Sequence, residues 1–360
     1  MSRLGVQFEN KIVFLWLAAL IPRPGLSQEP PVFTTGTNTV LVDLSVTGDQ
    51  SLTDHLKREN FNLFENGRPV TISGIAREEL PMDVVLICQL PIRTQDTVWN
   101  NAGLAKDHRI GNEDTVTMRG GFALKQENTA QRLMNAAANA VLGAKTEDRV
   151  AIVVYGRDPR IQLQFTNDRK AIAAGIKALG NVDNADENIV LSSEGLAIEY
   201  ATRMLSNVER NDPNSRANRR RLIVLISSVF GVGAPYADAP IIRRLWAQDI
   251  VFSVIDDTRP TAATTSVMRT SGGEAQTVLF RRYKPIHIAA ATGGDRIVAM
   301  DPQHPVSMLT AVRQRYTLWF NQPADASPGT ERTIKVDLSA ESRSRFPNAI
   351  ITSREGYVAR

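Results

Sequence analysis

The sequence predicts an α/β fold: a doubly wound, mostly parallel sheet with one antiparallel edge strand, and a small β-module built from the N- and C-terminal segments. Three observations support this prediction. Four continuous apolar runs are typical of strands that are covered on both faces. Helical patterns separate these runs, and such alternation indicates a mostly parallel sheet with helices on both sides. Near both ends of the chain, apolar and polar residues alternate, as they do in half-buried strands.

The four apolar runs are expected to be the parallel strands of the sheet, at residues 84–88, 150–154, 222–226 and 250–255. The clearest helical patterns between them span residues 129–142, 168–179 and 195–208. A further run, 161–165, follows Tyr155 after a link that is too short for a helical crossover. Such a link makes a hairpin, so this run predicts the antiparallel strand.

The two ends of the chain carry strand patterns of a different kind. Residues 40–46 alternate, and 60–64 lead into a turn at Asn66-Gly67; near the C-terminus the strand patterns lie at 316–320, 333–338 and 349–352. Each end is too small to bury much core alone. We therefore expect segments 28–79 and 316–360 to pack together as one sandwich-like module, with an α/β domain, 80–315, inserted between them.

Composition excludes several classes of protein. The 360 residues include 42 Lys and Arg and 38 Asp and Glu, a net charge of +4. This balance is ordinary for a globular protein and gives no basic stripe for nucleic acid. A single cysteine rules out an internal disulfide framework and a cysteine-based zinc site, and the four histidines lack metal-ligand spacing.

The first 27 residues have the features of a secretory signal peptide. Arg3 and Lys11 precede the apolar run 12–21, and small residues follow up to Ser27, after which we expect cleavage. As a helix, this run would cross only half of the roughly 30 Å hydrocarbon core, so we expect no integral span after cleavage. The mature chain is then secreted or periplasmic; an uncleaved anchor is the alternative.

Several short motifs, taken in order and spacing, resemble the von Willebrand factor type A-related secreted proteins of the acidobacterial type. The resemblance covers almost the whole chain after the signal segment and implies the von Willebrand factor A-like form of the doubly wound fold. It rests on residues 61–70, 80–86, 148–154, 164–168, 291–294, 315–319 and 354–357.

In ion-binding members, that family holds Mg²⁺ with a metal-ion-dependent adhesion site. The resemblance places its ligand positions on Gln89, Pro91 and Arg93 after the first strand, on Ser228 after a later strand, and near 192–193. Both aspartates are absent and a cation is added, which disfavours tight Mg²⁺ binding. We therefore expect a degenerate site without metal or another cofactor. Mg²⁺ would bind only if other carboxylates, at Asp96 or 256–257, rebuilt the site.

Long connections after the strands enlarge the carboxyl edge of the sheet, where open α/β sheets usually bind ligands. We expect a non-catalytic protein-binding or scaffolding module whose contact residues are Arg93, Trp99, Tyr236 and Arg282, because aromatic and Arg side chains dominate interface energetics. The plainer interpretation is that Trp99 packs its own loop and the arginines are solvated. The alternatives for function are a metal-dependent adhesion domain with a rebuilt site and a hydrolase of unrecognised type.

Arginines also cluster just before the run 222–226. Arg216, Arg219, Arg220 and Arg221 could form a patch for an anionic partner, but a solvated turn is the favoured interpretation. Cys88 lies inside an apolar run and is expected to be a buried, unreactive thiol.

Overall fold

The computed structural model describes residues 39–48, 56–77, 79–89, 134–141, 143–156, 158–179, 194–211, 219–227, 237–256, 265–269, 275–279, 284–298 and 303–360. All of them belong to one compact unit, Thr37–Arg360. The predicted fold class is confirmed: the chain is mixed α/β, with a mostly parallel central sheet accompanied by antiparallel sheets.

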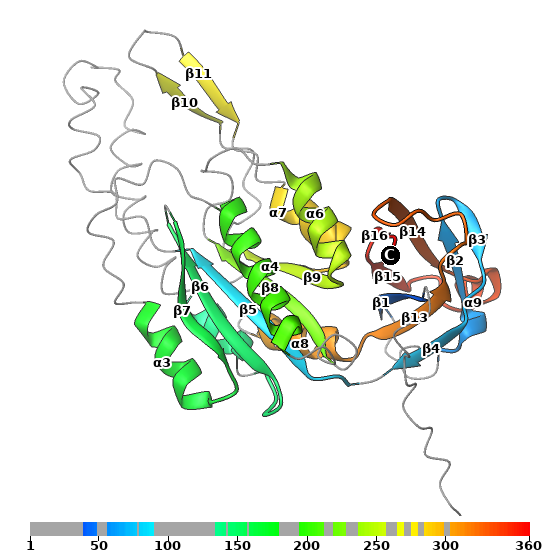
Figure 1. Ribbon diagram of the computed structural model, residues 1–360, viewed down its shortest axis with the longest axis horizontal. Coiled ribbons are helices and arrows are strands. Elements are labelled where there is room, and N and C mark those ends of the chain that lie inside the picture. Colours follow the sequence, from blue (N-terminus) through cyan, green and yellow to red (C-terminus); the bar gives the residue numbers. More distant parts are fainter. Residues whose placement is uncertain are drawn as a thin grey trace, which may run out of the picture. The chain divides into compact units, whose positions relative to one another are not determined.

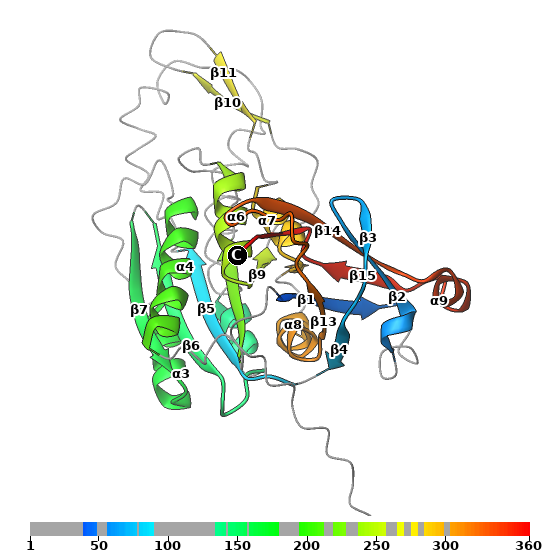
Figure 2. The same cartoon turned by 45° about the vertical axis from the view of Figure 1, so that its right-hand side comes forward.

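The central sheet has the strand order β12-β9-β8-β5-β6-β7. The strands are β5 (Met82–Gln89), β6 (Arg149–Tyr155), β7 (Pro159–Thr166), β8 (Arg220–Ser227), β9 (Ile250–Asp256) and β12 (Arg296–Val298). The edge strand β7 lies beside β6 (Figure 2) and pairs antiparallel with it. The other pairs are parallel. Counted along the chain, the order is 3-2-1-4-5-6 from the β7 edge, which is the doubly wound order with a topological switch point between β5 and β8.

Helices cover both faces of the central sheet (Figure 1). The helical segment 134–141, α3 (Arg169–Leu179) and α8 (Gln303–Arg313) pack on one face. The other face is covered by α4 (Glu194–Asn211), α6 (Asp238–Ala247) and α7 (Lys284–Ala291). Strand residues alternate between these two cores with period two: Val84 and Leu86 enter the first, and Val85 and Ile87 the second. No helix in the described segments has the length and apolar character that a membrane span requires.

The ends of the chain together form two antiparallel sheets. One has the order β15-β1-β13-β4 and the other β16-β14-β2-β3. Their bounds are β1 (Thr39–Thr47), β2 (Phe61–Glu65), β3 (Arg68–Val70), β4 (Gly74–Arg77), β13 (Tyr316–Asn321), β14 (Glu331–Leu338), β15 (Ile350–Ser353) and β16 (Gly356–Val358). Strands from both ends of the chain contribute to each sheet, and the two sheets share one buried apolar cluster.

Shorter elements complete the described part of the chain. Asn66 and Gly67, with φ of 46° and 76°, make the tight turn between β2 and β3, as their sequence predicts. A 3-10 turn, η2 (Arg58–Asn60), precedes β2, and α9 (Ala340–Arg345) follows β14. The strands β10 (Thr265–Arg269) and β11 (Ala275–Leu279) pair with each other.

Buried arginines join the central sheet to the strands of the β-module. Arg220, at the start of β8, is only 4% exposed; it forms an ion pair with Asp43 of β1 at 2.7 Å and donates to the carbonyl oxygen of Arg315 at 2.7 Å. Arg221 is 3% exposed. Arg219 donates to Asp83 at 2.8 Å. The expectation of a solvated turn was therefore wrong for these three residues, because each guanidinium lies among structural acceptors or in the protein interior.

The sequence motif 291–294 meets the motif 354–357 at this junction. Thr292 and Arg354 form an isolated β-bridge, and the amide of Glu355 donates to the carbonyl oxygen of Ala291 at 2.9 Å. Arg354 also forms an ion pair with Asp249 at 2.5 Å. These two pieces of the family resemblance thus have a structural role, which is to fasten the C-terminal strands to the α/β domain.

Candidate functional site

The candidate site lies at the carboxyl edge of the central sheet, where β5 and β8 end side by side. Gln89 is the last residue of β5 and Ser227 the last of β8. Gln89 pairs with Tyr155 of β6, and Cys88 pairs with Ile226, so Gln89 and Ser227 are the next residues along their parallel strands. This is the topological switch point, at which doubly wound sheets usually bind ligands.

Four buried polar side chains gather on one face of this edge. Gln89 and Tyr155 follow the alternation of their strands onto the face covered by α4, and Ser227 does the same. Glu194, the first residue of α4, is the fourth. Their exposed fractions are 8% for Gln89, 0% for Tyr155 and Ser227, and 4% for Glu194. We call these four residues the switch-point cluster.

A hydrogen bond between two neutral side chains joins the strand ends at the switch point. The hydroxyl of Ser227 donates to the side-chain carbonyl oxygen of Gln89 at 2.6 Å. Both groups are buried, so water competes little with this bond, and losing either partner would leave a buried polar group with less compensation. The bond therefore ties the ends of β5 and β8 together.

Burial favours the neutral form of the Tyr155 phenol within the cluster. Burial raises the pKa of Tyr155 well above its ordinary value, and the charge of Glu194 raises it further. Burial also raises the pKa of the nearby Cys88 thiol to about 12. Cys88 is 6% exposed, so its predicted burial is confirmed, and its raised pKa disfavours the reactive thiolate.

Of the four residues in the switch-point cluster, only one has a side chain of the kind that usually binds Mg²⁺. Glu194 offers a carboxylate, whereas the amide oxygen of Gln89 already accepts a hydrogen bond from Ser227. Mg²⁺ prefers about six oxygen ligands in an octahedron, usually including carboxylates. Across the described segments, no group of three or more His, Cys, Asp and Glu side chains is placed to hold a metal ion.

The structure describes only part of the site predicted from sequence. Gln89 is the last residue of β5, at the switch point. The backbone of Asp256 ends β9 and pairs with Ser227. Outside the described residues lie the other predicted ligand and contact positions, namely Pro91, Arg93, Asp96, Trp99, 192–193, Ser228, Tyr236, Asp257 and Arg282.

Sequence reasoning assigned no site role to Tyr155, Ser227 or Glu194. Each of the two strand residues comes directly after an apolar run, at the position that period two assigns to the α4 face. A search for polar residues at the carboxyl ends of all the apolar runs would have found them.

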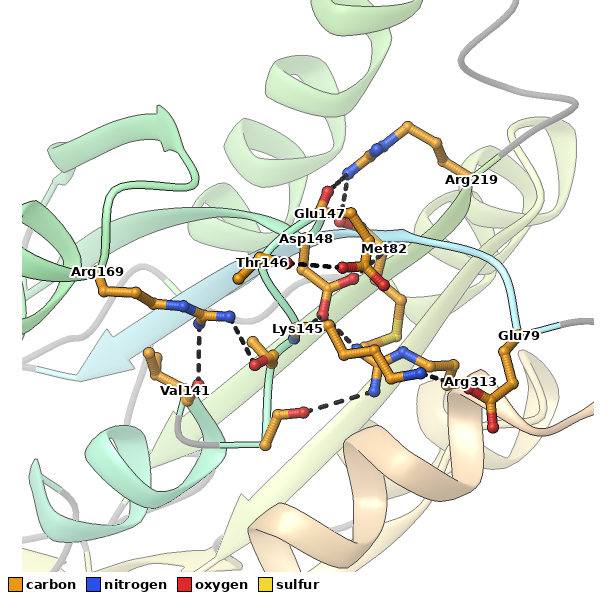
Figure 3. Close-up of polar contacts among 12 residues, drawn as sticks. Glu79, Met82, Val141, Lys145, Thr146, Glu147, Asp148, Arg169, Arg219 and Arg313 are labelled. Carbon is orange, nitrogen blue, oxygen red and sulfur yellow. Dashed lines mark hydrogen bonds and ion pairs between the residues drawn. The ribbon is translucent and has the colours of Figure 1, made fainter.

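A second polar cluster lies at the opposite, amino edge of the sheet (Figure 3). The fully buried carboxylate of Asp148 accepts hydrogen bonds from the amides of Met82 at 2.8 Å and Lys145 at 2.5 Å, and forms an ion pair with Arg313 of α8. Asp83, also fully buried, accepts two hydrogen bonds from Arg149, each of 2.7 Å. Both carboxylates are engaged by hydrogen bonds and ion pairs within the protein, which indicates a structural role and not a binding role.

Comparisons with known proteins agree with this architecture. Residues 117–231 match the sequence profile of the von Willebrand factor type A domain. The matched region begins after β5 and reaches past β8. No curated protein matches the chain.

Similar solved structures include an aerotolerance-related membrane protein from Bacteroides fragilis NCTC 9343, with 16% identity and a TM-score of 0.40 over 64% of this chain and 98% of that one. A von Willebrand factor type A protein from Catenulispora acidiphila has 10% identity and a TM-score of 0.40 over 91% of this chain and 75% of that one. The strand order gives the chain a mixed α/β fold with a mostly parallel central sheet, and its region 117–231 is similar to the von Willebrand factor type A domain.

Proposed function

We propose that the chain is a non-catalytic protein-binding or scaffolding module, and that its binding edge, the carboxyl edge of the central sheet, works without a divalent ion. The observation that carries this proposal is the 2.6 Å hydrogen bond between Ser227 and Gln89. It occupies the switch point with two neutral groups, at the position where the family resemblance places the first metal ligand.

Electrostatics supports a site without metal. A doubly charged ion must lose much of its hydration to enter a buried site, and anionic ligands normally compensate that loss. Gln89 contributes no charge, and the phenol of Tyr155, whose pKa is raised by burial, contributes none either. The family resemblance assigns the next ligand positions to Pro91 and Arg93, and a guanidinium there would repel the ion.

A second candidate function is metal-dependent adhesion through a rebuilt site. One observation favours it: Glu194 is a buried carboxylate at the same edge, 4% exposed. Together with carboxylates at Asp96 or 256–257, it could supply the missing negative charge. Removal of divalent ions distinguishes the two candidates, because only the rebuilt site needs them.

The described titratable pairs give little support to a hydrolase. His287 of α7 contacts Asp238 of α6 at 2.7 Å and is 57% exposed, which resembles half of a catalytic triad. In the described part of the chain, no hydroxyl or thiol is hydrogen-bonded to His287 as a nucleophile would be. A surface hydrogen bond between side chains near the starts of α6 and α7 accounts for the same contact.

We also propose that the mature chain begins after Ser27, that it is secreted or periplasmic, and that Arg93, Trp99, Tyr236 and Arg282 contact its protein partner. The signal pattern of the first 27 residues supports the location, and the residue types support the contacts. Both proposals concern segments that the structure does not describe.

The test is affinity capture with the tagged chain from the secreted and periplasmic fractions of its host, in parallel with Mg²⁺ and with EDTA. We expect the same partner to be recovered under both conditions, and recovery to fall in the variants Tyr236→Ala and Arg282→Ala but not in the matched surface variant Arg160→Ala. Loss of the partner in EDTA would favour the rebuilt metal site. Failure to recover any specific partner would overturn the proposal.

A further inference from the structure

The outward face of α4 carries an exposed apolar side chain beside an aromatic and a cationic one. Leu196 is 54% exposed and is one of only two large apolar side chains in the described segments that are strongly exposed. Tyr200 packs partly against the core beneath α4, and the Arg203 guanidinium lies over its ring, 5.6 Å from the ring centroid. Arg203 itself is exposed.

Helical spacing places these three side chains in one stripe. Residues four and seven positions apart lie on the same face of an α-helix. Leu196, Tyr200 and Arg203 have this spacing, and we call them the α4 stripe. Leu196 is in the first turn of α4, two residues after Glu194 of the switch-point cluster. The stripe therefore begins at the edge of the sheet that we propose as the binding edge.

The α4 stripe has a surplus positive charge. Glu199, its acidic neighbour on the helix, is engaged by Arg244 of α6 at 3.3 Å. On the adjoining helices, Asp238 is engaged by His287, and Arg243 lies 3.5 Å from Glu331. Arg203 forms no ion pair with a described carboxylate and is instead held over Tyr200. A partner that places a carboxylate near Arg203 would complement this charge.

The stripe is also partly ordered before any partner binds. Tyr200 is anchored on the core, and its contact with Arg203 restricts the arginine. Side chains already held in place lose less conformational entropy on binding. Tyr and Arg are enriched among residues that dominate binding energy, and an exposed Leu beside them provides apolar surface to bury.

We infer that the α4 stripe binds a segment of a partner protein that presents a carboxylate next to an apolar side chain. The carboxylate pairs with Arg203 and the apolar side chain packs on Leu196 and Tyr200. This inference rests on the proposed function and specifies which surface and which partner chemistry are used.

The test is selection from a displayed library of random short peptides on the immobilised full chain in EDTA. A selected peptide is then synthesised with a fluorophore and titrated by anisotropy. We expect the selected peptides to share an acidic residue beside Leu, Ile or Phe. Leu196→Ser and Arg203→Glu should each weaken binding by about tenfold or more, as expected of dominant contacts. A peptide with Lys in place of its acidic residue should bind Arg203→Glu more tightly than it binds the unmodified chain.

The matched control is Arg160→Glu, which makes the same charge change at an exposed position on β7. Arg160 pairs with Val154, whose side chain faces the core on the side of the sheet opposite α4. The affinity of the Arg160→Glu variant for the peptide should therefore equal that of the unmodified chain. Circular dichroism and thermal melting of all three variants should match the unmodified chain, because the substituted side chains are exposed.

Two results would overturn the inference. Selected peptides whose affinity is the same in Leu196→Ser and Arg203→Glu would bind elsewhere, which rejects the α4 stripe but leaves the proposed binding function intact. A library that yields no binding peptide would also reject the stripe. The proposed function is decided separately by partner capture in EDTA.

Discussion

The ion pair between Arg313 and Asp148 should be among the more stabilising polar contacts of the α/β domain. Arg313 is 3% exposed and Asp148 fully buried, and the pair connects α8 with the amino edge of the sheet (Figure 3). We therefore predict that Arg313→Met strongly lowers the free energy of unfolding. The substitution keeps much of the apolar stem and removes the guanidinium, which leaves a buried carboxylate without its counterion.

The magnitude follows from what Asp148 retains. Breaking a buried ion pair by removing one partner costs about 3 to 5 kcal/mol. Asp148 keeps two backbone donors, the amides of Met82 at 2.8 Å and Lys145 at 2.5 Å, which still stabilise the carboxylate. The expected loss is therefore at the lower end, about 3 kcal/mol. The double variant Asp148→Asn/Arg313→Met should recover part of this loss, since it buries no unpaired charge.

Urea unfolding followed by circular dichroism measures these differences. Lys145→Met is the matched control, because it also removes one cation near Asp148 but from an exposed pair with Glu79, with side chains 44% and 50% exposed. Exposed pairs contribute about 0 to 1 kcal/mol, so this variant should be nearly neutral. The reasoning is refuted if Arg313→Met costs no more than Lys145→Met.

Three further predictions concern other parts of the chain. Ser227→Ala should lower the free energy of unfolding in urea by about 1 to 3 kcal/mol, because the buried carbonyl of Gln89 loses a donor; an unchanged midpoint would contradict this. Burial opposes ionisation of Asp43, but a neighbouring arginine and a threonine hydroxyl outweigh it and lower its pKa. The unmodified chain should therefore have a higher free energy of unfolding than Asp43→Asn, with the full difference above the ordinary pKa of aspartate. The difference should disappear as the pH falls through the lower pKa of the folded state. If the free energies of unfolding of the two proteins ran parallel throughout the acid range, the pairing would be contradicted. In Gly294→Ala, the new Cβ would lie 1.8 Å from a carbonyl oxygen of β9, which should lower the free energy of unfolding by about 3 kcal/mol or more. Gly329, at φ +81°, has open space around it, so Gly329→Ala should lower it by only about 1 to 2 kcal/mol. Equal melting temperatures of the two variants would contradict the close approach at Gly294.

The central sheet could be predicted because its strands carry their own signal. A strand buried on both faces must be apolar at every position, and residues 84–88 and 222–226 are continuous apolar runs of this kind. The antiparallel direction of β7 could be predicted from the length of its connection alone, since the link after Tyr155 is too short for a helical crossover. The helix α6 was not predicted, because it begins without a side-chain cap at Ala237 and has Pro240 in its first turn.

The buried arginines at the start of β8 show where sequence reasoning fails. Arg220 precedes an apolar run and has charged neighbours, so its local pattern is that of a solvated turn. Its acidic partner, Asp43, lies on a strand that is distant in the chain. Such pairing depends on tertiary packing, which no local pattern records. For the same reason, Gln89 was found through its strand position, whereas its bond to Ser227 required the parallel register of β5 and β8.

The most direct test of a binding edge that works without metal is a calorimetric titration of the full chain with Mg²⁺ and with Mn²⁺ at millimolar concentrations. Our account predicts no saturable heat and no increase in melting temperature with either ion. A one-site isotherm that disappears in Glu194→Gln would contradict it and would establish a rebuilt metal site at the switch point.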